Sequence, residues 1–281
     1  MKKILVPTDF SSFADSALKM ALDLANKSGA EIVLLNVMLT PDNTKIQASE
    51  KGINIINNSE SKYLMENVEA VQKNLNELIK ESGYKKMSYQ IISGNITQSV
   101  IDYAKTEKID LIIMGTQGEG GYDAIFVGSN AEKIVRLSDC PVITIRKYKE
   151  TETFDNIVFA SNFSDKYNYP VESLKVFQQL FNARLSLVYV NTPGNFTPTE
   201  ELNKKADKFI QKYNIENCSF HIYCDFVEDD GIINFAKSSN ADMVAVASQK
   251  RRGFARLLSG SVSEGVVNVS SIPVLTLSLE K

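Results

Sequence analysis

The chain has 281 residues, 43% of them hydrophobic, which is enough for two domains that each bury a core. Its 31 basic and 34 acidic residues leave a formal net charge of −3 without a long block of one sign, which argues against general nucleic-acid binding. No apolar run approaches the roughly 20 residues that span a bilayer, and the three cysteines form no disulfide framework. We therefore expect a soluble, cytoplasmic protein.

The first half of the sequence alternates short apolar runs with amphipathic segments. Strands are predicted over 3–8 and 31–37, with a helix over 13–27 between them. The polar, turn-rich stretch 40–60 follows, and its composition is typical of a long loop or lid. The remaining predicted elements are a helix at 61–82, a strand at 87–92, a helix at 98–105, a strand at 110–114, a helix at 130–137 and a strand at 141–146. This half should hold five strands and four helices.

The second half repeats this order. "KILVPTDFS" at 3–11 overlays "NIVFASNFS" at 156–164, so residue 3 faces residue 156 and the offset is 153. From residue 104 onward the offset is 132, and "GSNAEKIVRLSDCPVITI" then faces "GSVSEGVVNVSSIPVLTL". The extra residues of the first half are assigned to 40–60. We predict domains at 1–148 and 154–281, joined by a charged linker.

Apolar strands that alternate with helices predict an α/β fold with a doubly wound parallel sheet in each half. Ligands of such folds lie at the carboxyl ends of the strands, where the winding reverses. The two halves are expected to pack as a pseudo-dimer through their last strands, where "CPVITI" and "IPVLTL" could pair across a two-fold axis.

Three segments should meet at the strand ends of the first half. Thr8 and Asp9 follow the first strand, Val37 ends the second, and the glycine-rich segment 114–130 follows the fourth. Glycines let a ligand approach the main chain, and a helix that starts near Gly128 offers unpaired amides to phosphate. Each feature also has a structural explanation, because glycines after a strand form turns, and hydroxyl or carboxylate side chains cap helices.

The spacing Gly115-x2-Gly118-x9-Gly128-Ser129, with "ILVPTDFS" at the start and "CPVITI" at the end of the domain, resembles the universal stress protein family. The chain is similar to a tandem member throughout. The resemblance implies two five-stranded sheets of the adenine nucleotide alpha hydrolase-like type, with flavodoxin-like winding.

In its nucleotide-binding branch, this family holds ATP or AMP. The resemblance implies that Asp9 contacts the adenosine, the Val37 main chain contacts the adenine edge and Gly115 contacts the ribose. Thr8 lines the same mouth. The phosphates would lie against Gly118, Gly128, Ser129 and Asn130. Gln117 departs from the histidine of many members, but its amide can still donate to a phosphate.

The second half departs further from the family pattern. Asp9 is matched by Asn162, Gly115 by Ala247 and Gly118 by Lys250. We therefore predict that this half does not bind ATP in the same manner. The basic residues Lys250, Arg251 and Arg252, with Arg256, bind another anion, face the nucleotide of the sister domain, or form a solvated face.

Two other features carry alternatives. Cys218-x2-His221-x2-Cys224 invites a zinc site, but residue 221 would point to the opposite face of a strand and a fourth ligand is needed, so small buried thiols are the alternative. Phe126 either covers the nucleotide or packs on the partner domain, and the general tendency of aromatic side chains to be buried favours packing. The first half contains no histidine, which excludes histidine-based catalysis there within one chain, whereas carboxylates remain possible. We name no catalytic residue and no metal ligand.

The sequence thus favours a stress-response protein whose N-terminal domain binds an adenine nucleotide and acts as a switch or scaffold. The alternatives are a weak ATPase that uses Mg²⁺ and a structural member that binds no nucleotide. A protein partner and a homodimer remain open, whereas nucleic acid and membrane are not expected.

Overall fold

The computed structural model describes residues 1–40, 45–56, 61–116, 128–148, 154–249, 265–267 and 270–279. The N-terminal half, residues 1–148, contains strands β1 (Lys3–Pro7), β2 (Glu31–Met38), β3 (Lys45–Ser49), β4 (Gly52–Ile56), β5 (Met87–Ser93), β6 (Leu111–Gly115) and β7 (Val142–Ile145). Its helices are α1 (Ser12–Ser28), α2 (Ser61–Ser82), α3 (Ile96–Thr106) and α4 (Ser129–Leu137).

The C-terminal half, from residue 154 onward, repeats this order. Its strands are β8 (Asn156–Ala160), β9 (Arg184–Asn191), β10 (Cys218–Cys224), β11 (Met243–Gln249) and β12 (Val274–Leu279). Its helices are α5 (Val171–Phe181), the short 3-10 helix η1 (Pro193–Asn195), α6 (Thr199–Tyr213) and α7 (Glu228–Ser238). Residues 265–267 are helical as well, at the place that matches α4.

The described strands form one sheet in the order β10-β9-β8-β11-β12-β7-β6-β1-β2-β5-β3-β4. In each half the five shared strands are parallel and lie in the order 3-2-1-4-5. The doubly wound α/β class is therefore confirmed, but the flavodoxin-like winding, which would be 2-1-3-4-5, is wrong.

Helix placement explains this order. The helices α1 and α2 bury their apolar sides in one core on the same face of the sheet, so two successive right-handed crossovers carry the chain outward from β1 to β2 and then to β5. The helix α3 packs on the opposite face and returns the chain to β6, beside β1. The winding therefore reverses between β1 and β6.

The stretch predicted as a loop or lid is instead mostly a β-hairpin. Strands β3 and β4 pair antiparallel, and β3 continues the sheet by pairing antiparallel with β5, with Ala48 opposite Ile91. Ile46 and Ala48 are buried, and Gly52 adopts a φ of 142° in the turn. Burial of these two side chains is enough to hold β3 in place, because the outer edge of β5 supplies main-chain hydrogen bonds to it. The N-terminal half thus has seven strands rather than five.

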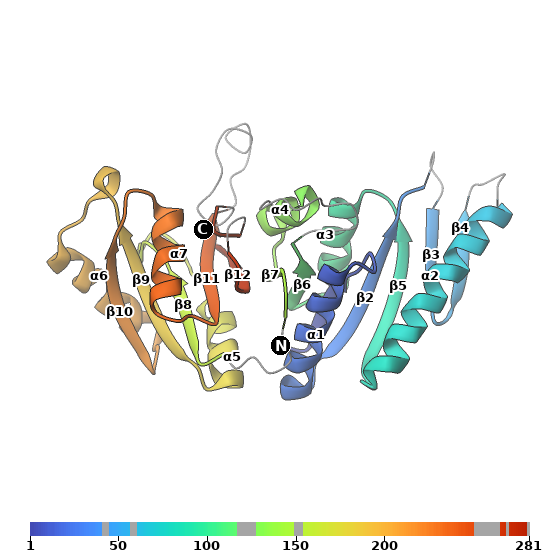
Figure 1. The fold of residues 1–281 in the computed structure, drawn as a ribbon, viewed down its shortest axis with the longest axis horizontal. Helices are drawn as coiled ribbons and strands as arrows, with labels where there is room; N and C mark the ends of the chain where they lie inside the picture. The colour runs from blue at the N-terminus through green and yellow to red at the C-terminus, as the bar shows by residue number, and fades with distance from the viewer. Residues whose placement is uncertain are drawn as a thin grey trace.

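The two halves meet at their last strands, as predicted. The strands β7 and β12 pair antiparallel, with Ile143 opposite Leu275, Thr144 opposite Val274, and Val142 opposite Thr276. Under the offset of 132, Ile143 faces its own counterpart, Leu275, and the two flanking pairs are counterparts of each other. A two-fold axis between the strands produces this pattern. Figure 1 shows β7 and β12 facing each other between the blue-to-green half and the yellow-to-red half.

Helices of both halves share the two faces of this sheet. One continuous core lies under α1, α2, α5 and α6, and a second lies under α3, α4 and α7. In the C-terminal half the Phe154 and Phe181 rings lie 4.6 Å apart, and Lys27 Nζ of α1, in the N-terminal half, lies 5.4 Å from the centre of the Phe181 ring. In the described parts of the chain, no helix is both long and apolar enough to cross a membrane.

Candidate functional site

The reversal point between β1 and β6 brings together the predicted residues of the first strand and the glycine segment. Ile4 lies opposite Leu111 and Leu5 opposite Ile112. Extending this register by three residues places Thr8 beside Gly115. With Asp9, Val37 and the first turn of α4, these residues form what we call the strand-end site.

A tight turn follows β1. The Phe10 amide donates to Thr8 Oγ1 at 3.2 Å, and the Ser11 amide donates to Asp9 Oδ1 at 3.0 Å. Phe10 has a φ of 64°, which is uncommon for a residue other than glycine, and Ser11 then caps α1. The turn gives Asp9 a structural role, and it also holds this exposed carboxylate at the mouth of the site.

The β1–β2 ladder stops early, and this leaves Val37 open. The Thr8 amide donates to Leu35 O at 2.9 Å, but Thr8 O accepts its hydrogen bond from the side chain of Asn36, also at 2.9 Å. A continued ladder would have offered that carbonyl to the Val37 amide. Leu35 directs its main-chain groups toward β1, and Val37, two residues on, directs its own to the same side. The β1–β2 register ends with Pro7 opposite Leu35, so β1 provides no further ladder partner for Val37.

Gly115 has a packing reason to be glycine. A Cβ atom there would lie 2.7 Å from the main-chain carbon of Phe13 and 2.8 Å from its carbonyl oxygen, so α1 crosses β6 too closely for any side chain. The next residue, Thr116, is only 3% exposed, and its Oγ1 has no hydrogen-bond partner among the described residues. Thr116 O accepts from the Gly128 amide at 2.6 Å, which ties the end of β6 to the start of α4.

The helix α4 begins directly beside these residues. Its N-cap, Gly128, provides no side-chain cap, and Ser129 is exposed. The first amides of the helix therefore have no intrahelical partner, and the helix dipole makes this end attractive to an anion. Asn130 is partly committed elsewhere, because its Oδ1 accepts from Thr97 Oγ1 at 3.2 Å and so ties α4 to α3.

Sequence reasoning missed four residues around this site. Gly94, with a φ of 145°, donates its amide to Met38 O at 3.1 Å, and Asn95 caps α3 by accepting from the Gln98 amide. A Gly-Asn pair before helical periodicity is a recognisable start signal that could have indicated this turn. The roles of Asn36 and Thr116 have no comparable signal in the sequence.

Several predicted residues lie outside the described part of the chain. They are Gln117, Gly118, Phe126, Lys250, Arg251 and Arg252. Their assignments remain predictions from the sequence.

The matching turn of the C-terminal half keeps its shape but uses its acceptor differently. The Ser164 amide donates to Asn162 Oδ1 at 3.2 Å, and Phe163 has a φ of 50°, as in the first half. Here the Tyr169 hydroxyl also donates to Asn162 Oδ1, at 2.8 Å. This half therefore has no carboxylate at the turn, and its amide oxygen already accepts two hydrogen bonds.

Two further differences lie at the strand ends of the C-terminal half. Asn191 forms paired hydrogen bonds with Thr197, each 3.0 Å long, which hold the segment after β9 against the end of that strand. The helix α7 begins with three consecutive acidic residues, and its Asp229 matches Thr97 of α3. Burial, with added repulsion from Glu228 and Asp230, raises the pKa of Asp229 to about 6.

The zinc alternative does not fit the geometry of β10. Cys218 packs against the core beneath α6, whereas the His221 ring lies 5.1 Å from the Phe235 ring of α7, on the other face. Cys224 is exposed. The described residues contain no group of three side chains that could hold a metal ion.

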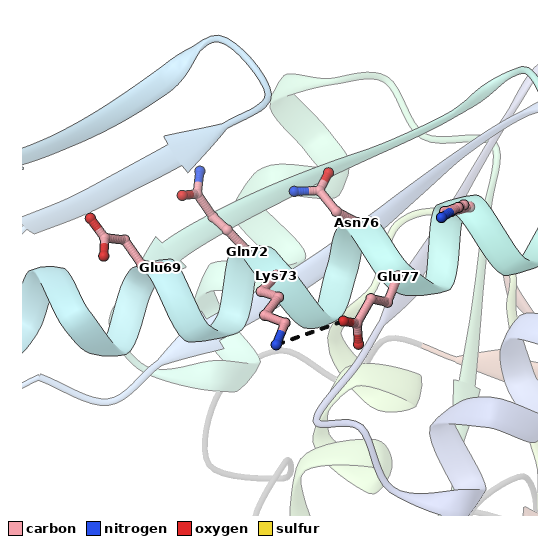
Figure 2. Close-up of a pocket in the computed structure, with 6 residues that line it drawn as sticks. Glu69, Gln72, Lys73, Asn76 and Glu77 are labelled. Atoms are coloured by element: carbon pink, nitrogen blue, oxygen red, sulfur yellow. Dashed lines mark ion pairs between the residues drawn. The ribbon is translucent and has the colours of Figure 1, made fainter.

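A shallow depression runs along the outer side of α2 (Figure 2), lined by Glu69, Gln72, Lys73, Asn76, Glu77 and Lys80. On this exposed face Lys73 Nζ lies 4.0 Å from Glu77 Oε1. Gln72 Nε2 donates to Ser49 O and to the Tyr89 hydroxyl, so it fastens the hairpin to the helix. These contacts explain the polar side chains structurally, and the depression shares no residue with the strand-end site.

Comparison with known proteins agrees with this architecture. A model of the universal stress protein family matches residues 1–146 and 227–278. Universal stress protein MJ0531 of Methanocaldococcus jannaschii is 30% identical over 149 residues, which are 53% of this chain and 84% of that protein.

Two solved structures also match. A universal stress protein from Archaeoglobus fulgidus is 20% identical and covers 98% of both chains with a TM-score of 0.72, so the fold is shared across both halves. Another universal stress protein, solved in complex with cAMP, is 18% identical and covers 52% of this chain and 97% of its own, with a TM-score of 0.40.

Proposed function

Because this chain belongs to the universal stress protein family, we propose that its N-terminal half binds an adenine nucleotide, ATP or AMP, at the strand-end site. Occupancy would act as a switch or scaffold in a stress response. In this proposal Asp9 and Thr8 face the adenosine, Val37 meets the adenine edge and Gly115 flanks the ribose. The phosphates lie at the start of α4, against Gly118, Gly128, Ser129 and Asn130.

The observation that carries the proposal is the interrupted ladder beside Val37. Asn36 takes the carbonyl of Thr8 and the β1–β2 register ends at Leu35, so β1 leaves the main-chain N–H and C=O of Val37 for a ligand at the carboxyl end of β2. Adenine presents an amino donor and ring-nitrogen acceptors along one edge, which this pair complements. In the sheet, β1 lies between β2, which carries Val37, and β6, which leads to α4. A phosphate chain that extends from the ribose in that direction would meet the positive end of the α4 dipole.

We infer that the C-terminal half does not bind ATP in this manner. It lacks the carboxylate of Asp9, and Asn191 and Thr197 hold a loop over the end of β9. Its α7 also places acidic side chains at the crevice where the phosphates would approach. We therefore expect one nucleotide per chain.

The test is calorimetric titration of the full chain with ATP, AMP and GTP, with and without Mg²⁺, combined with mass spectrometry of ligands that co-purify. Saturable binding of an adenine nucleotide near one per chain, without GTP binding, is expected. Two sites per chain, or no heat with either adenine nucleotide at millimolar concentration, would overturn the proposal. A parallel phosphate-release assay on bound ATP distinguishes a binding module from an ATPase.

A further inference from the structure

The C-terminal half contains a cavity of about 420 Å³ at the amino-terminal ends of its strands, away from the crevice described above. Its walls come from the starts of β8 and β9, the middle of β10 and the end of α7. Asn156, Arg184, Ser186, His221, Phe235 and Ser239 line it. The volume lies in the range of small-molecule sites.

The first half fills the corresponding space with larger, self-paired side chains. Lys3, which matches Asn156, makes an ion pair of 2.8 Å with Glu107, which matches Ser239. Val33, which is 4% exposed, stands where the second half has Ser186. Shorter polar side chains in the second half therefore open the cavity.

The main chain around the two places is the same, so the difference lies in the side chains. Asp110 Oδ2 accepts from the amides of Lys2 and Lys3, and Asp242 Oδ2 accepts from those of Asp155 and Asn156. The polar side chains of the cavity are also held in place. Ser186 Oγ donates to Asn156 Oδ1 at 2.8 Å, and Asn156 Nδ2 donates to Ser239 O at 2.9 Å.

Two donors of this cavity remain for a ligand. Arg184 stands where the first half has Glu31, and within the described residues its guanidinium has no ion-pair partner. His221 Nε2 lies 2.8 Å from Ser219 Oγ, so the tautomer in which that hydroxyl donates keeps the ring proton on Nδ1. Burial, and then the charge of Arg184, lower the pKa of His221. The lowered pKa favours the neutral ring, which in this tautomer offers its Nδ1 proton beside the Arg184 cation.

We propose that this cavity binds a small anion that carries one carboxylate or phosphate group. Arg184 offers the paired N–H geometry that such groups accept, His221 adds a second donor, and the buried Phe235 ring supports an apolar portion of the ligand. Asp155 also lines the rim, and the carbonyl end of α7 adds partial negative charge, so a polyphosphate is disfavoured.

The chain's single histidine makes this proposal directly measurable, because His221 gives the only imidazole signals in a proton NMR spectrum. The full chain is titrated with sodium acetate, sodium phosphate or sodium chloride at constant ionic strength. We expect a saturable shift of the His221 ring signals with acetate, phosphate or both, but not with chloride. The His221 pKa should rise on binding, because an anion beside the ring stabilises the imidazolium.

Substitutions separate this site from general charge effects. Arg184→Gln should weaken the binding about tenfold, the loss expected for a charged hydrogen bond. Lys208→Gln removes the same charge from exposed α6 and should change nothing. Ser239→Glu restores the acidic residue of the first half, so it should abolish binding, and it decides the question if Arg184→Gln fails to fold.

The outcomes are distinct. Saturation by phosphate alone assigns a phosphate-bearing ligand, and saturation by acetate alone assigns a carboxylate. A linear shift, a shift equal to that of chloride, or a saturable shift that survives both Arg184→Gln and Ser239→Glu would overturn the proposal. ATP binding is measured on the same variants by calorimetry, so failure of this site and failure of the proposed nucleotide site are told apart.

Discussion

Introducing a carboxylate at the start of α4 separates phosphate recognition from recognition of the nucleoside. Ser129 is the first residue of α4 and is exposed, so Ser129→Asp places a negative charge where the phosphates are proposed to lie. An acidic residue in the first turn complements the helix dipole, so the helix should keep its stability. The substitution therefore changes the site without weakening the fold.

The expected loss follows from Coulomb's law. At a separation of about 5 Å and an effective dielectric constant of about 40, suited to an exposed position, one phosphate charge is repelled by about 1.7 kcal/mol. This corresponds to roughly 15-fold weaker binding of AMP or ATP. Adenosine has no phosphate, so its affinity should not change.

The assay is calorimetric titration of ATP, AMP and adenosine into the wild type, Ser129→Asp and a control. Thr199→Asp adds the same charge to the first turn of α6, an exposed helix start in the other half, and should leave all three affinities unchanged. An equal loss for adenosine and AMP, or undiminished ATP binding, would refute the placement of the phosphates at α4.

Three further outcomes are expected. Asp9→Asn should keep the turn, because Asn162 forms the same turn in the second half. The affinity for adenosine, measured by calorimetry, should fall about tenfold, and unchanged affinity would contradict the role of this carboxylate. Gly115→Ala should lower the free energy of unfolding by about 1–3 kcal/mol in urea titrations, because the new Cβ overlaps the Phe13 main chain; wild-type stability would contradict that close approach. The raised pKa of Asp229, about 6 against an ordinary 3.8, means that the folded state holds this proton more tightly than the unfolded state. Stability should therefore fall as pH rises from about 4 to 6, and Asp229→Asn should remove that part of the fall; identical pH profiles of the two proteins would argue against it.

Local patterns predicted most of the architecture. The seam between the halves was accessible because "CPVITI" and "IPVLTL" are apolar strands that end matching repeats, and each would otherwise leave an exposed edge. The hairpin at Lys45–Ile56 was missed because its strands are short and partly polar, and they are held by the edge of β5 rather than by their own pattern. The predicted strand order was wrong because the order depends on which face of the sheet each crossover helix covers, and periodicity alone does not reveal that face.

The strand-end site was predictable only in part. Thr8, Asp9 and Gly115 follow strands, and the carboxyl ends of parallel strands converge, so their proximity follows from the fold class. Asn36 acts through a hydrogen bond to a neighbouring strand, and the Thr116 hydroxyl is notable only because it is buried without a described partner. Both facts depend on three-dimensional packing. The close approach of α1 is enough to explain the glycine at 115, and its predicted contact with the ribose stays a prediction.

The seam between β7 and β12 is short, with three facing residue pairs in its register. Any contact between two separate chains weakens on dilution, whereas two halves of one polypeptide stay at an effective concentration fixed by their tether. The covalent connection thus keeps a symmetric partner in place without demanding high affinity from it. The side chains of one half can therefore differ from those of the other while its last strand continues to cover the edge of its partner.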